Sequence, residues 1–240
     1  LALEAADGSV VDKVTYDDHT PWPESPDGNG ASLELIRPDL DNISPCSWAR
    51  RHNSGTPGAQ NDRYSTDNLS PCITNVSHSP VFPRVSQPVR VTALVSDDEA
   101  LTSVTLRYRP QGESNYLGLP MVDNGLHQGI YTALIPPQSA GKYVEFMLEA
   151  VDSVVAARVA PIGAPGGVSS ETGLPMTVSY LYLVEDSSPD STLPLYRLIL
   201  TDQNRAEIQA RSLDSDVLLD ATFVYEGEVF YNVGLRYRGE

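Results

Sequence analysis

Three short acidic runs contain the oxygen ligands that a hard metal ion needs. They are Asp39–Asn42, Asp97–Glu99 and Asp123–Gly125. Carboxylate and amide oxygens on a loop suit Ca²⁺, although no run has the twelve-residue spacing of an EF-hand loop. The alternative is a solvated turn, in which Asp and Asn side chains hydrogen-bond to their own backbone. The best Ca²⁺ candidate is the set of side chains Asp39, Asp41 and Asn42.

Three aromatic residues offer a second kind of site. Tyr16, Trp22 and Trp48 lie in the first part of the chain, and such rings can form a platform on which a sugar or a peptide binds. The alternative is a hydrophobic plug at the end of a small β-sandwich, because large aromatic side chains contribute much of the buried area of a core. The plug is the commoner role, and we favour it.

The two cysteines, Cys46 and Cys72, each follow a proline in a loop-like context. Their spacing matches no metal motif. A disulfide between them would close the junction between a first unit and the middle of the chain, and would contribute about 3 kcal/mol through loop-closure entropy. The alternative is two free, partly buried thiols. An acidic, lysine-poor chain of β type is typical of exported proteins, in which disulfides persist, so we expect the disulfide.

The rest of the sequence argues against several chemistries. The four histidines are scattered and lack the spacing of zinc ligands. No Gly-x-Ser-x-Gly elbow or phosphate-binding P-loop occurs. A formal net charge of -16 repels nucleic acid and anionic membrane surfaces, and no run approaches the roughly 20 apolar residues of a membrane span. We therefore expect no catalytic residue in this stretch, and no cofactor except the candidate Ca²⁺.

The elements that position these residues are β-strands. Val89–Val95, Val104–Tyr108 and Val144–Ala150 alternate apolar and polar side chains, as strands with one buried face do. Turn residues separate these runs. The spacing predicts an antiparallel β-sandwich of immunoglobulin or fibronectin type III style. The expected fold class is mostly β, with antiparallel immunoglobulin-like β-sandwiches in tandem and a short α+β segment at the C-terminal end.

Residues 1–61 form the first expected unit. Val10–Tyr16 and Ala31–Ile36 are predicted strands that flank an aromatic loop and a glycine-rich turn. The pattern VxYDDxxPWPxxxDGxGxSLELxxPxxDN, followed by Trp48 and GTPGAxN, resembles the C-terminal half of a bacterial lamin-tail domain. The resemblance implies a partial immunoglobulin-like sandwich that serves bacteria as an extracellular accessory module.

Residues 62–75 are a predicted polar linker, and residues 76–186 form the central sandwich with a Gly/Pro-rich tail. The patterns VxVTAxVxD and VEFxxEAxD resemble the immunoglobulin-like or fibronectin-like domains that follow lamin-tail domains in large secreted bacterial proteins. Near the end of this unit, Met176–Val184 is predicted as one strand that either completes the sandwich or bridges to the next unit.

The C-terminal segment mixes strand and helix signals. Leu195–Leu200 is a predicted strand. Thr201 or Asp202 can cap a short helix that runs to about Arg211, with an acidic residue at its start and a basic residue near its end. Two strand-like runs then flank Glu226–Gly227, which predicts a β-hairpin.

Residues 193–240 resemble the start of a CotH-type (spore-coat) kinase domain, through LPLYRLILT and ATFVYEGEVFYNVGLRYRGE. The resemblance implies an atypical protein-kinase fold. In a complete domain of this type, ATP and Mg²⁺ are bound by a lysine and by carboxylates that lie further along the chain. Lys13 and Lys142 are the only lysines here, and both lie outside the segment. We therefore expect no ATP/Mg²⁺ site and no catalysis from this stretch itself.

These observations favour a non-catalytic structural, adhesion or presentation segment of a large secreted or surface bacterial protein. We expect the chain to be a piece of that protein, located outside the cell. Its expected partners are neighbouring domains of the same chain and a protein or glycan at the cell surface. Two alternatives stay open: the N-terminal arm of a CotH-type protein kinase, and a carbohydrate-binding accessory module.

Overall fold

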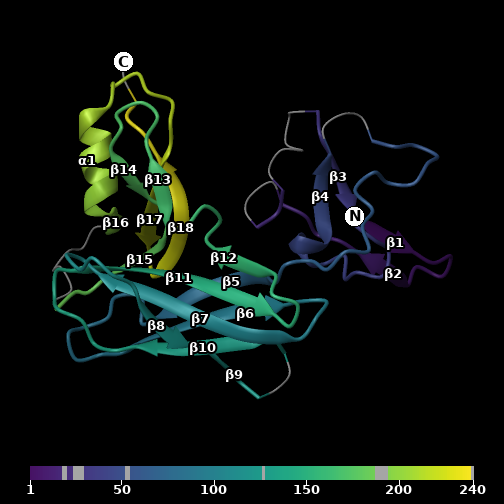
Figure 1. Ribbon diagram of the computed structural model, residues 1–240, viewed down its shortest axis with the longest axis horizontal. Helices are drawn as coiled ribbons and strands as arrows, with labels where there is room; N and C mark the ends of the chain where they lie inside the picture. Colours follow the sequence, from purple (N-terminus) through teal and green to yellow (C-terminus); the bar gives the residue numbers. More distant parts are fainter. Residues whose placement is uncertain (18–20, 24–29, 52–54, 126–127, 187–193, 239–240) are drawn as a thin grey trace.

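The computed structural model describes residues 1–17, 21–23, 30–51, 55–125, 128–186 and 194–238 (Figure 1). The chain is mostly β, with antiparallel strands in several sheets, and α1 (Asp202–Ala210) is the one α-helix among the described residues. This result confirms the expected fold class. Figure 1 shows the N-terminal strands to one side, a central sandwich, and the C-terminal strands with α1 packed on the sandwich.

Two sheets form the central sandwich. The first has the order β5 (Cys72–Ser79), β6 (Val89–Ser96), β10 (Ile130–Ile135), β9 (Val122–Asp123). The second has the order β12 (Ala157–Ala160), β11 (Tyr143–Asp152), β7 (Leu101–Pro110), β8 (Leu117–Pro120). The predicted alternation holds in β6, whose apolar side chains point inward. The core between the sheets includes Val91, Leu106, Ile135, Phe146 and Leu148, all 0% exposed.

The strand predicted over residues 176–184 is two strands with different partners. β14 (Pro175–Thr177) pairs with β13 (Gly166–Val168), and β15 (Tyr180–Leu183) pairs with β11. β15 lies along the first half of β11, and β12 lies along the second half of the same edge. The segment therefore both completes the sandwich and leads to the next unit.

The pairing of β13 with β14 requires glycine at position 166. Gly166 has a φ of +104°, and a Cβ there would lie 2.3 Å from the carbonyl oxygen of Met176, so a residue with a side chain would clash with β14.

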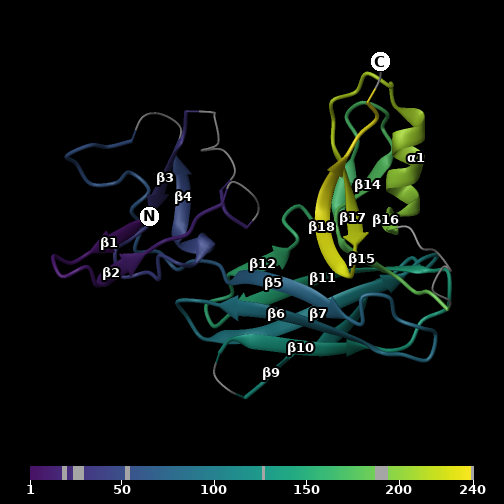
Figure 2. The same cartoon turned by 180° about the vertical axis from the view of Figure 1, so that it is seen from behind.

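The C-terminal unit is a three-stranded sheet with one helix. Its strands are β16 (Tyr196–Ile199), β17 (Leu219–Tyr225) and β18 (Glu228–Leu235), with β17 in the middle. The predicted hairpin at Glu226–Gly227 is confirmed. Thr201 caps α1, because its side chain accepts a hydrogen bond from the backbone N–H of Asn204. Figure 2 shows β17 and β18 from behind, with α1 along one side of the unit.

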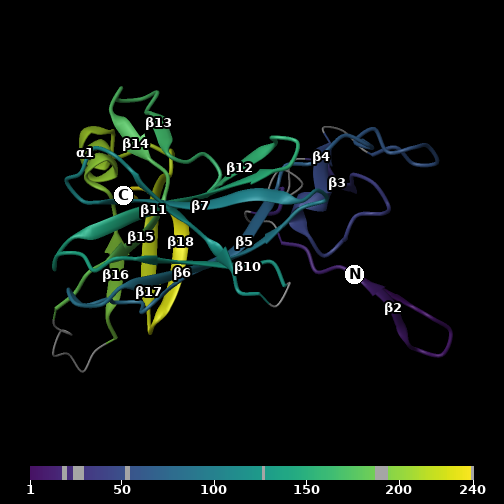
Figure 3. The same ribbon diagram turned by 60° about the horizontal axis from the view of Figure 1, so that its bottom comes forward.

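Two clusters of buried side chains join the C-terminal sheet to the sandwich. Tyr231 of β18 contacts a group of rings from the sandwich, which comprises His78, Phe146 and Tyr180. The second cluster combines Tyr143 and Leu181 of the sandwich with Ile199 and Val224 of the C-terminal sheet. The two units therefore share apolar core, and Figure 3 shows β17 and β18 side by side, running across the strands of the sandwich.

The N-terminal part is the least packed. It contains β1 (Ala2–Glu4) with β2 (Val10–Lys13), and β3 (Ser32–Leu35) with β4 (Trp48–Arg51), preceded by a 3-10 turn at Pro45–Ser47. Among the described residues these are two separate two-stranded sheets. The residues of β1 and β2 are exposed, and the strand predicted over residues 10–16 ends at Lys13. β5 begins at Cys72, inside the segment that was predicted as a linker.

Candidate functional site

A cleft of about 750 Å³ lies between β18 on one side and β5 and β12 on the other. This volume falls within the range of pockets that hold small ligands or peptide side chains. Pro21 and Cys46, from the N-terminal part, line one end. The cleft is therefore bounded by all three parts of the chain. Figure 1 shows β12 and β18, which contribute to its two walls, close to each other.

The strands meet the cleft by their edges. Consecutive residues line it: Ile73–Val76 of β5, Arg158–Ile162 around the end of β12, and Phe230–Gly234 of β18. Because successive side chains of a strand point to opposite faces, a consecutive run means that the backbone edge itself faces the cleft. β5, β12 and β18 are each the outermost strand on one side of their sheets.

The side chains of the cleft are mostly apolar. Ile162 is 58% exposed and Phe230 is 44% exposed, and both line the space together with Tyr180. Among the described residues that line the cleft, Arg158 is the one that carries a charge. Its Nε donates a hydrogen bond to the carbonyl oxygen of Pro71 at 3.2 Å, and none of the ion pairs between described residues involves it.

Two asparagines line the cleft at irregular positions. Asn75 in β5 has a φ of 50° and Asn232 in β18 a φ of 53°. Both lie where the register of their strand shifts, and Asn tolerates this left-handed conformation better than most residues. The side-chain amide of Asn232 donates to Oδ1 of Asp220 at 2.7 Å. Burial raises the pKa of Asp220 to about 6, although this hydrogen bond opposes the shift.

A second, smaller cavity of about 270 Å³ lies at the junction between the N-terminal part and the sandwich. Arg37 joins the two sides of this junction. Its Nε lies 3.1 Å from Asp39, and its Nη2 lies 2.7 Å from Asp98 of the loop after β6. Its Nη1 donates to the carbonyl oxygen of Asp67 at 3.2 Å. Burial raises the pKa of the adjacent Asp97 to about 6.

The candidate Ca²⁺ ligands make contacts within turns and with neighbouring strands. Asp39 is paired with Arg37. Oδ1 of Asp41 accepts from the N–H of Ile43 at 3.0 Å, and the amide of Asn42 donates to Asp12 at 2.7 Å. Among the described residues, no group of three or more His, Cys, Asp or Glu side chains is arranged to hold a metal ion. A Ca²⁺ site at these three residues stays a prediction.

The three candidate aromatic residues are not equivalent. The rings of Trp22 and Trp48 lie 6.2 Å apart, and Trp22 is 9% exposed. The indole N–H of Trp48 donates to the carbonyl oxygen of Asn42 at 2.9 Å. Tyr16, in contrast, is 59% exposed. This arrangement favours the plug for the two tryptophans, and a ligand platform at Tyr16, Trp22 and Trp48 stays a prediction.

Cys46 and Cys72 form a disulfide, with their Cα atoms 5.7 Å apart. Cys46 belongs to the 3-10 turn before β4, and Cys72 is the first residue of β5. The bond therefore ties the N-terminal part to an edge strand of the sandwich, close to the Arg37 ion pairs.

Of the four histidines, His78 is the one that lies among the described residues; His19, His52 and His127 lie outside them. His78 is 6% exposed, and burial lowers its pKa to about 4. Its Nε2 lies 3.1 Å from the carbonyl oxygen of Val81, and its Nδ1 contacts the hydroxyl of Tyr231. It is therefore a neutral, satisfied residue of the interface between the sandwich and the C-terminal sheet.

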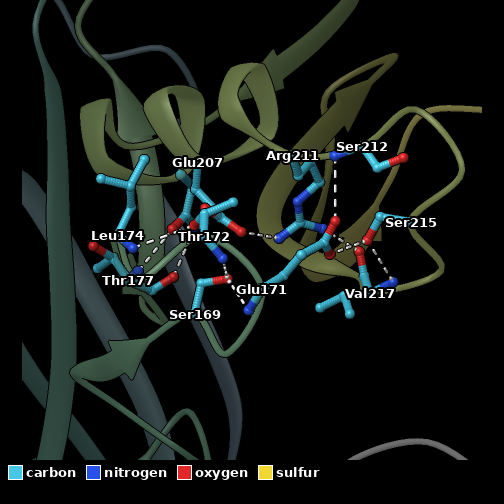
Figure 4. A network of polar contacts seen from close by, with 11 residues as sticks. Ser169, Glu171, Thr172, Leu174, Thr177, Glu207, Arg211, Ser212, Ser215 and Val217 are labelled. Carbon is cyan, nitrogen blue, oxygen red and sulfur yellow. Dashed lines mark hydrogen bonds and ion pairs between the residues drawn. The ribbon is translucent and has the colours of Figure 1, made fainter.

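A buried ion pair fixes the β13–β14 turn against α1 (Figure 4). The side chains of Glu207 and Arg211 are both 0% exposed, with 2.6 Å between Oε1 and Nη2. Thr172, in the turn, donates its hydroxyl to the other oxygen of Glu207. Glu171 of the same turn accepts from the hydroxyl of Ser215 at 2.6 Å. These contacts are structural, because they hold both charged groups inside the unit, although Nε of Arg211 has no partner among the described residues.

The edge-lined cleft was not predicted from the sequence. Its walls come from strands that are far apart in the chain, so no local spacing reveals it. The signals that were present are the register-breaking asparagines Asn75 and Asn232, and an arginine, Arg158, in an apolar strand. None of these residues indicates a cleft unless the order of the strands in the sheets is known.

No family model matches the chain, and no curated protein matches it. One similar solved structure is described as the crystal structure of a Br derivative of BhCBM56, a carbohydrate-binding module. The two sequences are 10% identical over the match, which covers 40% of this chain and 89% of the chain in that structure, with a TM-score of 0.23. A TM-score this low establishes no shared fold, and we draw nothing from it. No described helix is long and apolar enough to cross a membrane.

Proposed function

We propose that this chain is a non-catalytic structural segment of a large exported bacterial multidomain protein. It holds its neighbours in a fixed arrangement for adhesion or presentation. The observation that carries this proposal is that the central sandwich is fastened on both sides, covalently to the N-terminal part and through a shared core to the C-terminal sheet.

The N-terminal attachment combines three kinds of contact. The disulfide joins Cys46 to Cys72, and the hydroxyl of Ser44 lies 3.6 Å from the sulfur of Cys72. Arg37 bridges to Asp98 in the sandwich, and both side chains of this pair are mostly buried, at 13% and 16% exposed. Exposed ion pairs contribute little, but a bridge that is screened from water restricts the orientation of the joined parts more effectively.

The C-terminal attachment is a packed interface with polar anchors. The hydroxyl of Tyr143 accepts from the backbone N–H of Asp202 at 2.9 Å, at the start of α1. Glu185, which follows β15, forms two hydrogen bonds with Arg197 of β16, at 2.6 and 3.0 Å. Such a bidentate pair fixes geometry as well as distance. These contacts indicate a fixed interface between the sandwich and the C-terminal sheet, because a hinge between them would have few contacts of this kind.

The export of the parent protein rests on the disulfide and on the resemblances. Disulfides persist mainly outside the reducing cytosol. Residues 1–61 resemble a lamin-tail domain and residues 193–240 resemble the start of a CotH-type domain, and both resemblances agree with a secreted or surface bacterial protein. On this proposal the sandwich is the spacer between the two.

Calorimetric unfolding tests whether the sandwich and the C-terminal sheet act as one body. We expect one cooperative transition for the two, and Tyr231→Ala is expected to split it, because this change removes the ring that joins β18 to the sandwich. Two separate transitions in the unchanged protein would contradict a fixed arrangement.

Titration with ATP and Mg²⁺ separates this proposal from catalysis by the chain itself. We expect no heat of binding, because both lysines lie outside residues 193–240. Saturable ATP binding at micromolar concentration would contradict this proposal, because it would place a nucleotide site within this stretch.

A further inference from the structure

Along the edge of β18 that faces the cleft, the backbone N–H and C=O groups have no hydrogen-bond partner among the described residues. β18 pairs with β17 on one side and with no described strand on the other. The backbone hydrogen bonds that lie outside the sheets include none from the described residues of β18. Unpaired N–H and C=O groups along a strand edge are a template for another extended chain.

The surroundings of this edge restrict what can pair with it. The opposite wall is formed by the edges of β5 and β12, so a second complete sheet cannot approach β18 without meeting the sandwich. A single extended peptide needs only about 5 Å beside the edge and about 10 Å across its side chains. The cleft therefore suits one strand rather than a sheet.

We propose that an extended peptide segment adds to the free edge of β18 as an extra antiparallel or parallel strand, with apolar residues at alternate positions and a carboxylate that pairs with Arg158. The unpaired edge supplies main-chain hydrogen bonds, and the apolar lining supplies pockets for alternate side chains. This occupant goes beyond the proposed structural function, which needs no ligand.

The positive charge of the cleft lining favours a peptide that carries a carboxylate. Arg158 is the one charged residue of the cleft lining, and the ion pairs between described residues leave it without a carboxylate partner. A guanidinium beside an apolar wall binds a carboxylate with two parallel hydrogen bonds. A basic peptide would instead place its cation against this guanidinium.

Aromatic side chains around the edge fit the same occupant. Phe230 and Tyr180 line the cleft from two different sheets. An added strand would cover Phe230, a residue that is 44% exposed in the free protein. Covering such a ring removes apolar area from water, which drives binding of the alternate apolar residues.

The test is calorimetric titration of the whole chain with two synthetic peptides. The first is acetyl-Thr-Ile-Thr-Val-Thr-Ile-Asp-amide. The second is acetyl-Asp-Thr-Ile-Thr-Val-Thr-Ile-amide, which has the Asp at its N-terminal end. We expect one of them to bind, and we expect replacement of its Asp by Asn to weaken binding about 10-fold. In the Arg158→Gln protein the Asp and Asn peptides should bind equally, because Gln keeps a donor for the carbonyl of Pro71 but carries no charge.

Backbone N-methylation distinguishes strand addition from simple apolar contact. Two versions of the binding peptide are N-methylated at alternate residues, one version for each set. Because a strand offers every second N–H to its neighbour, one version should bind like the parent peptide and the other should lose binding. The inference is overturned if both versions bind like the parent, or if none of the peptides binds at about 1 mM.

Discussion

His78 of β5 and Tyr231 of β18 form a hydrogen bond across the interface between the sandwich and the C-terminal sheet. Nε2 of His78 lies 3.1 Å from the carbonyl oxygen of Val81, so this nitrogen carries the proton and donates. Nδ1 therefore accepts from the Tyr231 hydroxyl, whose pKa is raised by burial so that it stays protonated. The neutral ring also stacks on Tyr182, with 5.2 Å between the centroids.

This arrangement predicts a loss of stability in acid. The unfolded chain protonates His78 at about pH 6.5, whereas burial lowers the pKa of the folded residue to about 4. The unfolded state therefore binds more protons between these values, and the stability due to neutral His78 is lost as pH falls from 6.5 to 4. The loss amounts to about 3 kcal/mol. Urea unfolding of the unchanged protein and of His78→Gln, at matched pH and salt, measures it.

The comparison with His78→Gln is needed because other groups titrate in the same range. Burial raises the pKa of Asp220 to about 6, from 3.8, so the folded state is the one that binds this proton more tightly. Its effect has the opposite sign, because the folded state gains stability as pH falls from 6 to 3.8. Asp220 is present in both proteins and cancels in the difference. A pH-independent difference between the two proteins would refute the role assigned to His78.

Removal of the Tyr231 hydroxyl tests the same interface without changing His78 itself. Tyr231→Phe keeps the ring contacts with Phe146 and Tyr180 but leaves Nδ1 of His78 buried without a partner. We expect a loss of about 1–3 kcal/mol in the free energy of unfolding. Tyr237→Phe is the matched control, because Tyr237 is exposed and should tolerate the change. Equal effects of the two changes would show that the hydrogen bond is not important.

The ion pair of Glu207 and Arg211 should behave as a buried pair. Arg211→Met leaves the carboxylate of Glu207 buried without its cation, and we expect a loss of about 3–5 kcal/mol. The double change Glu207→Met with Arg211→Met should be less destabilising than Arg211→Met alone, because it leaves no unpaired charge. A double-mutant cycle from chemical unfolding gives the coupling, and strict additivity would contradict the interpretation.

The cap of α1 predicts a smaller effect. Thr201→Ala removes the oxygen that accepts from the N–H of Asn204 at 3.1 Å, and we expect a loss of about 1 kcal/mol. Thr201→Ser is the matched control, because it keeps this oxygen. Hydrogen exchange of the first turn of α1 should rise in the alanine variant. Exchange that is unchanged in both variants would show that the cap is dispensable.

The sequence predicts those strands and helices that can be recognised from local residue patterns, without knowledge of the strands they pair with. β6 alternates inward and outward side chains, and Thr201 precedes a helical run, so both are visible locally. Residues 176–184 have uniform strand character, but the chain changes partners between Thr177 and Tyr180. That change depends on which neighbouring edges are free, and local patterning contains no such information.

Local sequence patterns reveal even less of the candidate site than of the strands. The disulfide pairing of Cys46 with Cys72 follows from there being only two cysteines. The cleft depends on three strand edges that the chain order separates by many residues, for example Asn75 and Asn232. The burial of His78 is likewise not visible in the sequence, because its partner, Tyr231, lies far away along the chain.

The disulfide should control the position of the N-terminal part. In Cys46→Ser with Cys72→Ser, the ion pair of Arg37 with Asp98 still joins residues 1–61 to the sandwich, but a single partly buried ion pair restrains the two parts less than a covalent bond does. We expect the changed protein to sample a range of orientations of residues 1–61, and to lose about 3 kcal/mol of stability. Reduction of the unchanged protein should have the same effect.

Small-angle X-ray scattering of the oxidised protein tests the central claim most directly. If the sandwich is fastened on both sides, one arrangement, that of Figure 1, should reproduce the scattering profile, and the double Cys→Ser variant should show a larger radius of gyration. The claim is contradicted if the oxidised protein already requires an ensemble of arrangements and the variant scatters identically.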